Sequence, residues 1–392
     1  MKLKLSRKQA KNLFIQAQGL NDPEPFGKGP GATVRAIQHL GYVQIDTINV
    51  IERCHHHILF TRIPSYRRMD LRLAQSRDKS VFEYWTHALA YVPTTDFKYF
   101  LPRMKAYAKD PRAWFRSVPQ KDTRAMLTRI RKEGPLSIRD IEDEVLKEKD
   151  HPWESRKPSK KVLQHAFYCG KLTVSERQGM LKKYELMDRH FDWEHPPKTP
   201  SLKECLDYLI DRALRSQAIV SLDSICYLRP KLKADILKRL EWKVRRQEIR
   251  PIEIQDLEGK AHWISTSLLD QKEPEPSELL HLLSPFDPLV IQRKRLLELF
   301  DHDHRFEAYL PKEKRRFGYF ALPILAGDEI VALIDLKTDR ERAKVLIQQM
   351  TWLPRKRTPA LKRKLEAELD RFAKFQLAKE PGPLSNKFSF IK

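Results

Sequence analysis

Residues 202–217 read LKECLDYLIDRALRSQ, with apolar side chains at helical spacing, and Ser221 opens the next short segment, SLDSICYL. A basic segment with the same helical spacing follows at 232–247. The chain continues as IRPIEIQDLEGKAHWIS, two strand-like runs that turn at Glu258 and Gly259. This order of elements, in which a hairpin follows helices of which the last is basic, is typical of a winged helix-turn-helix motif. The hairpin forms the wing.

The same order of segments occurs earlier in the chain. Residues 123–144 contain a helix, a Gly-Pro turn and a second helix that starts at a serine; residues 160–187 contain a basic helix and two strands around Gln178 and Gly179. A looser third copy fits the first 60 or so residues. We therefore predict an α+β protein with tandem winged helix-turn-helix motifs, although a helical bundle with hairpins would give a similar pattern.

Sequence signals predict where the helices of the N-terminal region begin and end. Ser6 and Gln9 form the capping-box pattern of a helix start, and a second short helix is expected to end at Gly41. The following run VQIDTINVI (43–51) is predicted to be a strand or a strand-like turn. The aromatic stretch FEYWTHALAYVP (82–93) is predicted to be mainly a core helix.

The last third of the chain changes character. The proline-rich segment QKEPEPSE (271–278) predicts a linker, and strand-like runs follow, with turns at PKEK and AGDE. A basic segment then becomes a helix with leucines on one face. The predicted regions are an N-terminal winged-helix-like region, a second and a third winged helix, a small antiparallel β domain, and a basic C-terminal helix and tail: 1–120, 121–195, 196–270, 277–345 and 346–392.

The charge of the chain indicates a polyanionic partner. Its 392 residues include 75 Lys and Arg against 52 Asp and Glu, a formal net charge of +23, so nucleic acid is the first candidate. No window approaches about 18 uninterrupted apolar residues, and no signal peptide is recognisable, so we expect no membrane partner and a cytoplasmic, nucleoid-associated protein. The 12 glycines form no phosphate-binding loop and the four cysteines no CxxC pair; we expect no cofactor.

Three consecutive histidines, His55 to His57, suggest a metal site at first sight. In an extended segment neighbouring side chains point to opposite faces, so at most His55 and His57 could converge. No nearby cysteine or HExxH pattern supplies further ligands, and we expect no metal. The histidines are expected to hydrogen-bond in the interior, contact phosphate or face solvent, with His56 and His57 as the candidates for DNA contact.

Gln44 and Asp46 precede the histidines at a spacing that places both side chains on one face of a strand. From the residues alone, Asp46 could cap a helix at Thr47 or pair with Arg53 or Arg62. Alternatively, Asp46 accepts a proton from water and stabilises a cationic transition state while Gln44 orients that water. Cleavage of an N-glycosidic bond passes through such an oxocarbenium-like state, and an alkylated purine leaves without a general acid.

The segment LGYVQIDTINVIERCHHHILFTRIPSY (40–66) resembles the bacterial DNA glycosylases that unhook interstrand crosslinks, the AlkZ/YcaQ type. The resemblance extends to LFIQAQGL, VFEYWTHALAYVP, LLSPFDPLVIQRKRLLELFDHDHRFEAYLPKEKRRFGYFALPIL and ALIDLKTDR, and so covers nearly the whole chain. It implies tandem winged helices with a β domain in a concave shape that receives duplex DNA. The catalytic motif of this family is glutamine, an apolar residue, then glutamine or aspartate; Gln44, Ile45 and Asp46 match its aspartate form, as in the crosslink-repair branch.

The resemblance implies a monofunctional DNA glycosylase that hydrolyses the N-glycosidic bond of N7-alkylated purines and unhooks interstrand crosslinks, with water as the nucleophile. It favours the catalytic interpretation of Gln44 and Asp46. A crosslinked base cannot be flipped freely, so an open cleft is expected. The partner would be alkylated or crosslinked double-stranded DNA, and a monomer is expected.

Residues just beyond the motif are candidates for supporting roles. Arg62 and Tyr66 could hold the DNA backbone, although Arg62 could equally pair with Glu52 or Glu83. Glu83 or His87 could support the active site by holding its residues in place without contacting the substrate.

The C-terminal half offers further candidate DNA contacts. Asp287 is expected to cap a helix, while Arg293 and Arg295 contact DNA or Asp287 itself. The basic helices at 160–171 and 233–246 are expected to give salt-dependent affinity that is largely independent of sequence. A turn near the β domain presents a basic cluster that could lie against phosphates: Lys312, Lys314, Arg315 and Arg316.

Two other classes of protein remain possible on the residues alone. The first is a non-catalytic winged-helix DNA-binding protein or transcription regulator, which would have no reason to present Gln44 and Asp46 to DNA. The second is a metal-dependent nuclease, which base release in the presence of EDTA would exclude.

Overall fold

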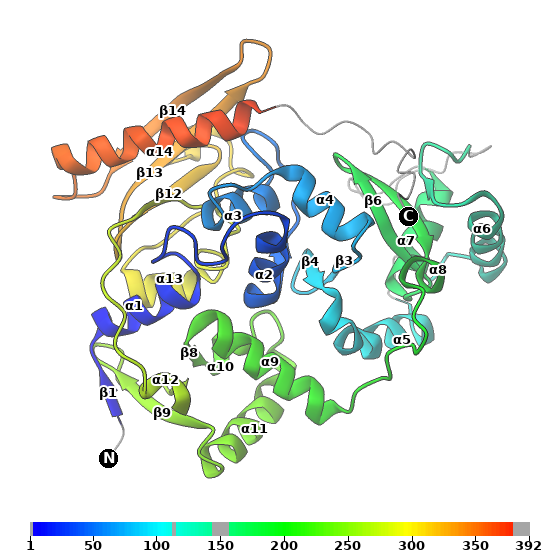
Figure 1. The fold of residues 1–392 in the computed structure, drawn as a ribbon, viewed down its shortest axis with the longest axis horizontal. Helices are drawn as coiled ribbons and strands as arrows, with labels where there is room; N and C mark the ends of the chain where they lie inside the picture. Colours follow the sequence, from blue (N-terminus) through cyan, green and yellow to red (C-terminus); the bar gives the residue numbers. More distant parts are fainter. Residues whose placement is uncertain (1–2, 112–114, 143–156, 379–392) are drawn as a thin grey trace, which may run out of the picture. The chain divides into compact units, whose positions relative to one another are not determined.

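The computed structural model describes residues 3–111, 115–142 and 157–378 (Figure 1). Within these ranges, no helix is long and apolar enough to cross a membrane. The chain divides into two compact units that alternate along the sequence, so the predicted N-terminal region 1–120 is shared between them. The first unit comprises Met1–Tyr66, Trp85–Tyr91 and Ser201–Ala378, and the second includes Arg67–Tyr84 and Val92–Pro200.

The N-terminal helices of the first unit form where the sequence signals place them. Helix α1 (Arg7–Ala17) carries the predicted capping box: Ser6 Oγ accepts the Gln9 N–H at 3.1 Å, and Gln9 Oε1 accepts the Ser6 N–H at 2.9 Å. Helix α2 (Pro30–Leu40) starts at a proline and ends at Gly41, whose φ of 76° is the left-handed conformation that closes many helices. Both predictions are confirmed.

The β-branched run after α2 is a strand only at its start. Strand β2 (Val43–Gln44) pairs antiparallel with β4 (Leu89–Pro93), and the Ile45 N–H still donates to the Leu89 carbonyl at 2.8 Å before the chain turns away. The three histidines then lie in helix α3 (Cys54–Arg62), so the expectation of an extended segment was wrong. Their side chains spread around a helix instead of alternating across a strand.

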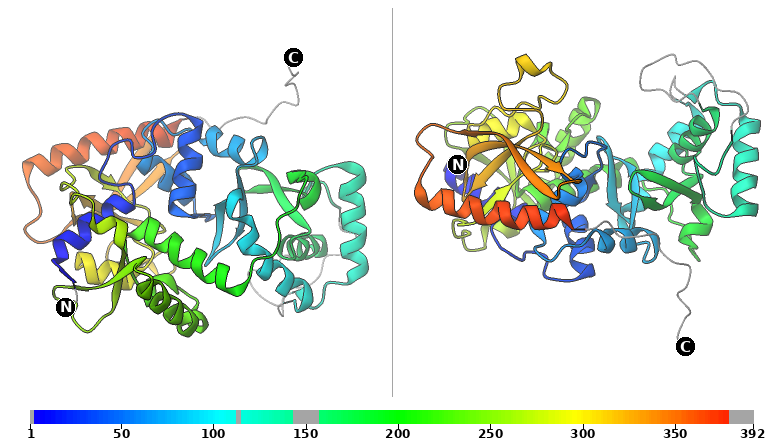
Figure 2. Two further views of the ribbon diagram at one scale, coloured as in Figure 1. Left: turned by 60° about the horizontal axis from the view of Figure 1, so that its bottom comes forward. Right: turned by 90° about the horizontal axis from the view of Figure 1, so that it is seen from above.

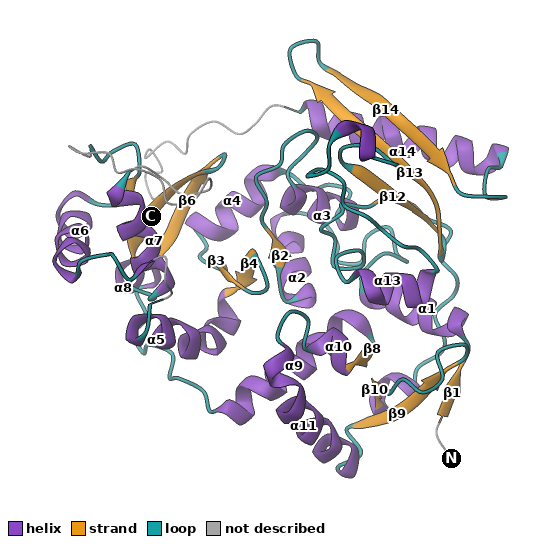
Figure 3. Ribbon diagram, turned by 180° about the vertical axis from the view of Figure 1, so that it is seen from behind, coloured by secondary structure: helices purple, strands orange, loops and turns teal. Residues whose placement is uncertain are grey.

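The third predicted winged helix has the expected order of elements (Figure 3). Its elements are α9 (Leu202–Gln217), β8 (Ile219–Ser221), α10 (Leu222–Ile225), a 3-10 turn (Pro230–Leu232), α11 (Lys233–Arg245), β9 (Ile249–Ile254) and β10 (His262–Ser265). An N-terminal strand that the sequence did not predict, β1 (Leu3–Leu5), pairs in parallel with β9 and extends the sheet to the order β1-β9-β10-β8. The apolar faces of α9 and α11 share one core through Ile210, Leu240 and Trp263.

The C-terminal part of the first unit contains an antiparallel sheet in the order β11-β12-β13-β14. Its elements, after the short helix α12 (Thr266–Leu269), are β11 (Leu280–Leu282), α13 (Arg293–Phe300), β12 (Ala321–Ala326), β13 (Glu329–Asp339), β14 (Lys344–Trp352) and α14 (Pro359–Leu377). Helix α14 lies along this sheet and contacts β11 and β14 (Figures 1 and 2). The predicted antiparallel sheet is therefore confirmed, although β14 continues past the predicted end at residue 345.

One predicted strand of this region is absent. Residues 305–311 (RFEAYLP) form an irregular loop that is closed by a turn, in which the Leu310 N–H donates to the Glu307 carbonyl at 2.9 Å. A 3-10 turn (Lys312–Lys314) follows directly. Pro311 cannot donate a backbone hydrogen bond, which disfavours a continuous strand here.

The second unit contains the region that the sequence predicts to be the second winged helix. Its elements are α4 (Arg68–Ser76), all but the last residue of β3 (Val81–Trp85), a 3-10 helix (Thr94–Phe100), α5 (Leu101–Lys109), α6 (Gln120–Glu133), β5 (Leu136–Ser137), α7 (Pro158–Tyr168), β6 (Leu172–Gln178), β7 (Leu181–Leu186) and α8 (Met187–Phe191). The basic helix and the hairpin around Gln178 and Gly179 are confirmed as α7 and β6–β7. The predicted helix from Ser137 begins as strand and turn, and its remainder lies outside the described residues.

Residues 82–93, predicted as a core helix, form the β3–β4 hairpin instead. Aromatic and β-branched side chains favour strands, and this preference outweighs the apparent helical spacing. Thr86 closes the turn, because its N–H and its hydroxyl both donate to the Ala88 carbonyl, at 2.8 and 3.2 Å. His87 lies at the tip of this hairpin.

Candidate active site

Gln44 lies at the end of β2, with its side chain buried. Its amide oxygen is 3.0 Å from Nε2 of His87, and its backbone carbonyl accepts the Cys54 thiol at 3.0 Å. The pairing of β2 with β4 brings Gln44 next to His87, because the hairpin tip directly precedes β4. Since the amide oxygen faces His87, the NH₂ group of the same carboxamide faces the opposite way.

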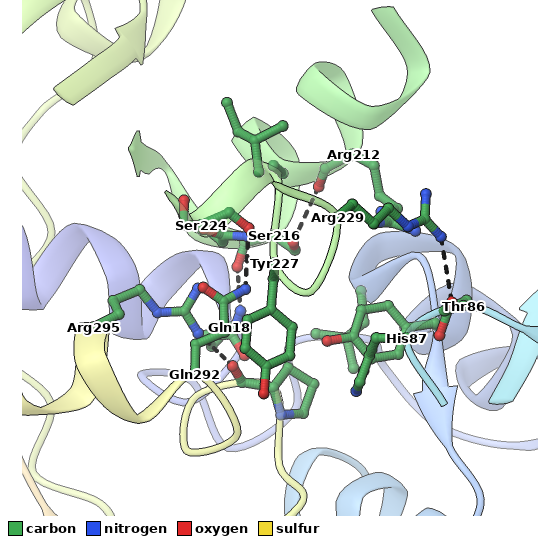
Figure 4. A pocket seen from close by; sticks show the side chains of 16 residues that line it. Gln18, Thr86, His87, Arg212, Ser216, Ser224, Tyr227, Arg229, Gln292 and Arg295 are labelled. Carbon is green, nitrogen blue, oxygen red and sulfur yellow. Dashed lines mark hydrogen bonds between the residues drawn. The ribbon is translucent and has the colours of Figure 1, made fainter. Parts of the chain in front are cut away.

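His87 is a neutral donor in this arrangement. Burial, followed by the positive charges of Arg212 and Arg229, lowers its pKa to about 4. The ring lies edge-on to Tyr42 and Tyr227, with centroid distances of 5.1 and 5.3 Å (Figure 4). A neutral imidazole has one N–H, and a hydrogen bond to the Gln44 oxygen requires that hydrogen on Nε2.

Asp46 lies in the loop beyond β2 and is partly exposed. Its Oδ1 accepts the Ile48 N–H at 2.8 Å, which closes a tight turn. Helix α3 starts only at Cys54, and among the described residues no cation forms a salt bridge with Asp46. The predicted capping at Thr47 and the pairing with Arg53 or Arg62 are therefore not observed in this part of the chain.

The loop between Asp46 and α3 is tied to strand β13. The Thr338 N–H donates to the Val50 carbonyl at 2.9 Å. The guanidinium of Arg340 donates to the backbone and side-chain oxygens of Asn49, at 3.1 and 3.0 Å, and to the Ile51 carbonyl at 3.0 Å. These bonds fix the backbone on which Asp46 is held.

Tyr309 is a further candidate that sequence reasoning missed. Its side chain is 72% exposed, and the adjacent Leu310 is 39% exposed, in the loop between α13 and β12. Partial burial and, to a smaller extent, the negative charge of Asp46 raise the pKa of Tyr309. Glu307 closes the loop, because its carboxylate accepts the N–H groups of residues 316 and 317, at 2.9 and 2.7 Å.

Arg62, a predicted DNA contact, has a structural role instead. Its guanidinium is fully buried, donates to both oxygens of Asp287 at 2.7 and 2.9 Å, and donates to the Gln18 carbonyl at 2.7 Å. This geometry does not allow it to reach a phosphate at the surface. The alternative partner Glu83 is also wrong, because that carboxylate pairs with Arg177 in the second unit.

The histidine triplet mostly supports the interior. His57 is 1% exposed, its Nε2 donates to the Leu282 carbonyl at 2.8 Å, and burial lowers its pKa to about 4, so we withdraw it as a DNA contact. Tyr66 is also buried, with its hydroxyl 2.6 Å from Nδ1 of His56, which is itself partly exposed. Within the described residues, no group of three His, Cys, Asp or Glu side chains is placed to hold a metal ion.

The basic residues of the C-terminal half are divided between surface and interior. Arg295 is buried and donates to the Pro288 carbonyl, so it does not present its guanidinium at the protein surface, as the prediction required. Asp287 caps a turn through the Leu289 N–H at 2.9 Å, whereas α13 starts later, at Arg293. The predicted contacts that lie at the surface are Arg293, Lys312, Lys314 and Arg316, with Arg315 partly exposed.

The formal net charge of +23 and the mixed helix and sheet fold suit an α+β protein that binds a polyanion. The family described as "DNA glycosylase AlkZ-like" matches residues 37–375, so the chain belongs to this family and is a DNA N-glycosylase. Among solved structures, the chain is similar to the Streptomyces sahachiroi DNA glycosylase AlkZ, with a TM-score of 0.62 and 17% sequence identity over 95% of this chain and 97% of that chain. This likeness confirms the predicted α+β fold, and the family makes DNA the partner.

Proposed function

We propose that this DNA glycosylase releases N7-alkylated purines and unhooks interstrand crosslinks, with Asp46 and Gln44 as the catalytic residues. One observation carries the proposal. The Asp46 carboxylate is partly exposed and has no salt-bridge partner among the described residues. Two positions before it lies Gln44, whose carboxamide is oriented by His87. Such a pair can hold a water molecule and stabilise a cation.

The proposed reaction uses the positive charge of the alkylated base. The bond between C1′ and N9 breaks, its electron pair goes to the purine, and the sugar becomes an oxocarbenium-like cation that the Asp46 carboxylate stabilises. Water then forms a bond to C1′ and gives a proton to Asp46. The NH₂ group of Gln44 donates a hydrogen bond to the oxygen of that water. The products are a free alkylpurine and an abasic site.

The exposure of Asp46 supports a crosslinked substrate. A base that is covalently bonded to the opposite strand cannot be extruded into a deep pocket, so the reacting sugar has to come to a carboxylate near the surface. Hydrolysis at one of the two linked purines frees the strands from each other. The detached purine remains bonded to its partner base.

Exposed cations and one exposed aromatic side chain are proposed to hold the duplex. Arg293, Lys314 and Arg316 would contact phosphates, which gives affinity that falls with salt. Tyr309 would stack on a base near the lesion, as exposed aromatic residues of nucleic-acid-binding proteins do. The partly exposed His56 stays a candidate phosphate contact.

A base-release assay on duplexes with N7-methylguanine or an N7-linked crosslink tests the proposal. Asp46→Asn keeps the shape of the side chain but removes its charge, so release is expected to fall at least about 10³-fold while duplex affinity changes only a few-fold. Asp270→Asn, at an exposed aspartate outside the motif, is the matched control and should keep the wild-type rate.

Two outcomes would contradict the proposal. If Asp46→Asn turned over at the wild-type rate, Asp46 would not be catalytic. If the wild type released other bases but neither N7-alkylated substrate, the substrate class would be wrong. Release in EDTA is expected to match release without it, because the reaction as drawn needs no metal.

A further inference from the structure

A small cavity lies beside His87 within the first unit (Figure 4). Its volume is about 30 Å³, measured as the space open to the centre of a water-sized sphere. That space would hold roughly two water molecules or one small anion. Side chains from α9, from the hairpin tip and from the segment before α13 line it, among them Ser216, Thr86 and Gln292.

The charge of the lining is strongly positive. Three arginines contribute to it, Arg212, Arg229 and Arg295, and the described residues that line the cavity include no aspartate or glutamate. The remaining polar groups are hydroxyls, amides and one neutral imidazole. Guanidinium groups present planar N–H donors that match the oxygens of carboxylate or phosphate.

Arg295 is the clearest sign of a missing acceptor. Figure 4 shows its guanidinium directed from α13 toward Gln18 and Gln292. Its Nη2 donates to the Pro288 carbonyl, but Nε and Nη1 have no hydrogen-bond partner among the described residues. Burial of the cation lowers its pKa to about 10. Unsatisfied N–H groups of a buried charge are costly, so an acceptor in the cavity would stabilise this arrangement.

The other two arginines are held in place by the fold. The guanidinium of Arg212 lies over the ring of Tyr42 at 5.5 Å, and Gly41 makes room for it, because a Cβ at position 41 would come within 2.4 Å of the Arg212 side chain. Arg229 donates to the Thr86 carbonyl at 3.4 Å, next to His87. Their positions are thus fixed before any ligand arrives, which lowers the cost of binding.

We propose that this cavity is a phosphate subsite, in which one tetrahedral oxyanion is bound by the lining arginines. The oxyanion is either a phosphodiester of the DNA backbone or free phosphate. Because the same cavity adjoins His87, a bound phosphate would lie behind the side chain that orients Gln44. The DNA source rests on the proposed function, whereas binding of free phosphate does not.

The first arm of the test uses inorganic phosphate. The unfolding temperature of the full chain is followed as phosphate replaces chloride at constant ionic strength. The wild type is expected to be stabilised, and the double variant Arg212→Gln, Arg229→Gln is expected to lose this response. Arg215→Gln removes one positive charge from α9 outside the cavity and should respond like the wild type.

The outcomes of this arm are decisive. An equal response in the wild type and the double variant, or no response in the wild type, would overturn the subsite and leave only water in the cavity. If the double variant did not fold, Arg212→Met, which keeps the aliphatic length over Tyr42, would replace it in the same comparison.

The second arm identifies the source of the phosphate. Duplexes with one neutral methylphosphonate, moved step by step around the lesion, are bound by the wild type and by the double variant. For a backbone phosphate, one position should weaken wild-type binding about tenfold and leave the variant unaffected, since one charge-assisted contact is lost. If phosphate stabilises the wild type but no methylphosphonate position weakens its duplex binding more than that of the double variant, the ligand is the free anion.

The Asp46→Asn variant separates failure of the subsite from failure of the proposed function. It should keep the thermal response to phosphate while losing base release.

Discussion

Nε2 of His87 lies 3.0 Å from the amide oxygen of Gln44 and joins the tip of the β3–β4 hairpin to the end of β2. The low pKa of His87, about 4, keeps this imidazole neutral, and the hydrogen bond to the Gln44 oxygen requires its hydrogen on Nε2. The carboxamide therefore has one preferred orientation. Its NH₂ group, which the proposed mechanism uses to hold water, is therefore positioned by His87.

Replacing His87 should consequently reduce turnover more than binding. In His87→Phe the amide of Gln44 loses its fixed orientation, and kcat for base release is expected to fall about 10- to 100-fold with KM nearly unchanged. His87→Gln, which can still donate, should recover part of the rate. The double variant with Gln44→Ala should be no slower than Gln44→Ala alone, because the two residues act as one unit. Additive losses in the double variant would contradict this role.

Tyr309 should contribute through its ring and not through its hydroxyl. Tyr309→Ala is expected to lower kcat/KM on lesion-containing duplex about 10-fold, because stacking of a base on an aromatic side chain contributes about 1–3 kcal/mol. Tyr309→Phe should stay within about twofold of the wild type, and Leu202→Ala, at an exposed leucine on α9, is the control. Rates are compared in single-turnover assays. Equal losses in Phe and Ala variants would instead assign the role to the hydroxyl.

Local signals in the sequence were sufficient for several boundaries. The capping box of Ser6 and Gln9, the helix stop at Gly41 and the hairpin turn near Gly259 each depend on residues within a few positions of one another. The choice of Gln44 and Asp46 as the candidate catalytic pair came from spacing and from resemblance. A strand was expected to align Gln44 and Asp46, but β2 ends at Gln44. The arrangement of the two side chains therefore depends on the loop that β13 holds in place.

Contacts between residues far apart in the chain could not be predicted from such local signals. Arg62 finds Asp287 and His57 finds the Leu282 carbonyl, each 225 positions away, and no sequence window contains both members. The same limit explains why Tyr309 was missed: its segment alternates like a strand, and only the fold places it within reach of the charge of Asp46.

Buried histidines should make the protein acid-sensitive. Burial lowers the pKa of His57 and of His281 to about 4, from 6.5 for an ordinary histidine. Between pH 6.5 and 4 the unfolded chain therefore binds protons that the folded chain does not. The free energy of unfolding is thus highest above pH 6.5 and falls as the pH drops toward 4. The loss is on the order of 3 kcal/mol for each histidine.

Urea unfolding at pH 7, 6 and 5 measures this effect. His57→Gln can still donate to the Leu282 carbonyl but does not titrate, so its free energy of unfolding should depend less steeply on pH than that of the wild type. His195→Gln, at an exposed histidine, should keep the wild-type slope. Parallel curves for the wild type and His57→Gln would show that His57 is not a source of the acid sensitivity.

The buried ion pair between Arg62 and Asp287 should be costly to break from one side. Both side chains are fully buried, and Asp287→Asn would leave the Arg62 charge without a counter-charge, which is expected to cost about 3–5 kcal/mol of unfolding free energy. The double variant Arg62→Leu, Asp287→Leu removes both charges and should be more stable than the single variant. Asp303→Asn breaks an exposed pair with Arg305 and should cost less than about 1 kcal/mol. Chemical denaturation of the four proteins measures these differences, and equal costs for Asp287→Asn and Asp303→Asn would show that the buried pair does not support the fold.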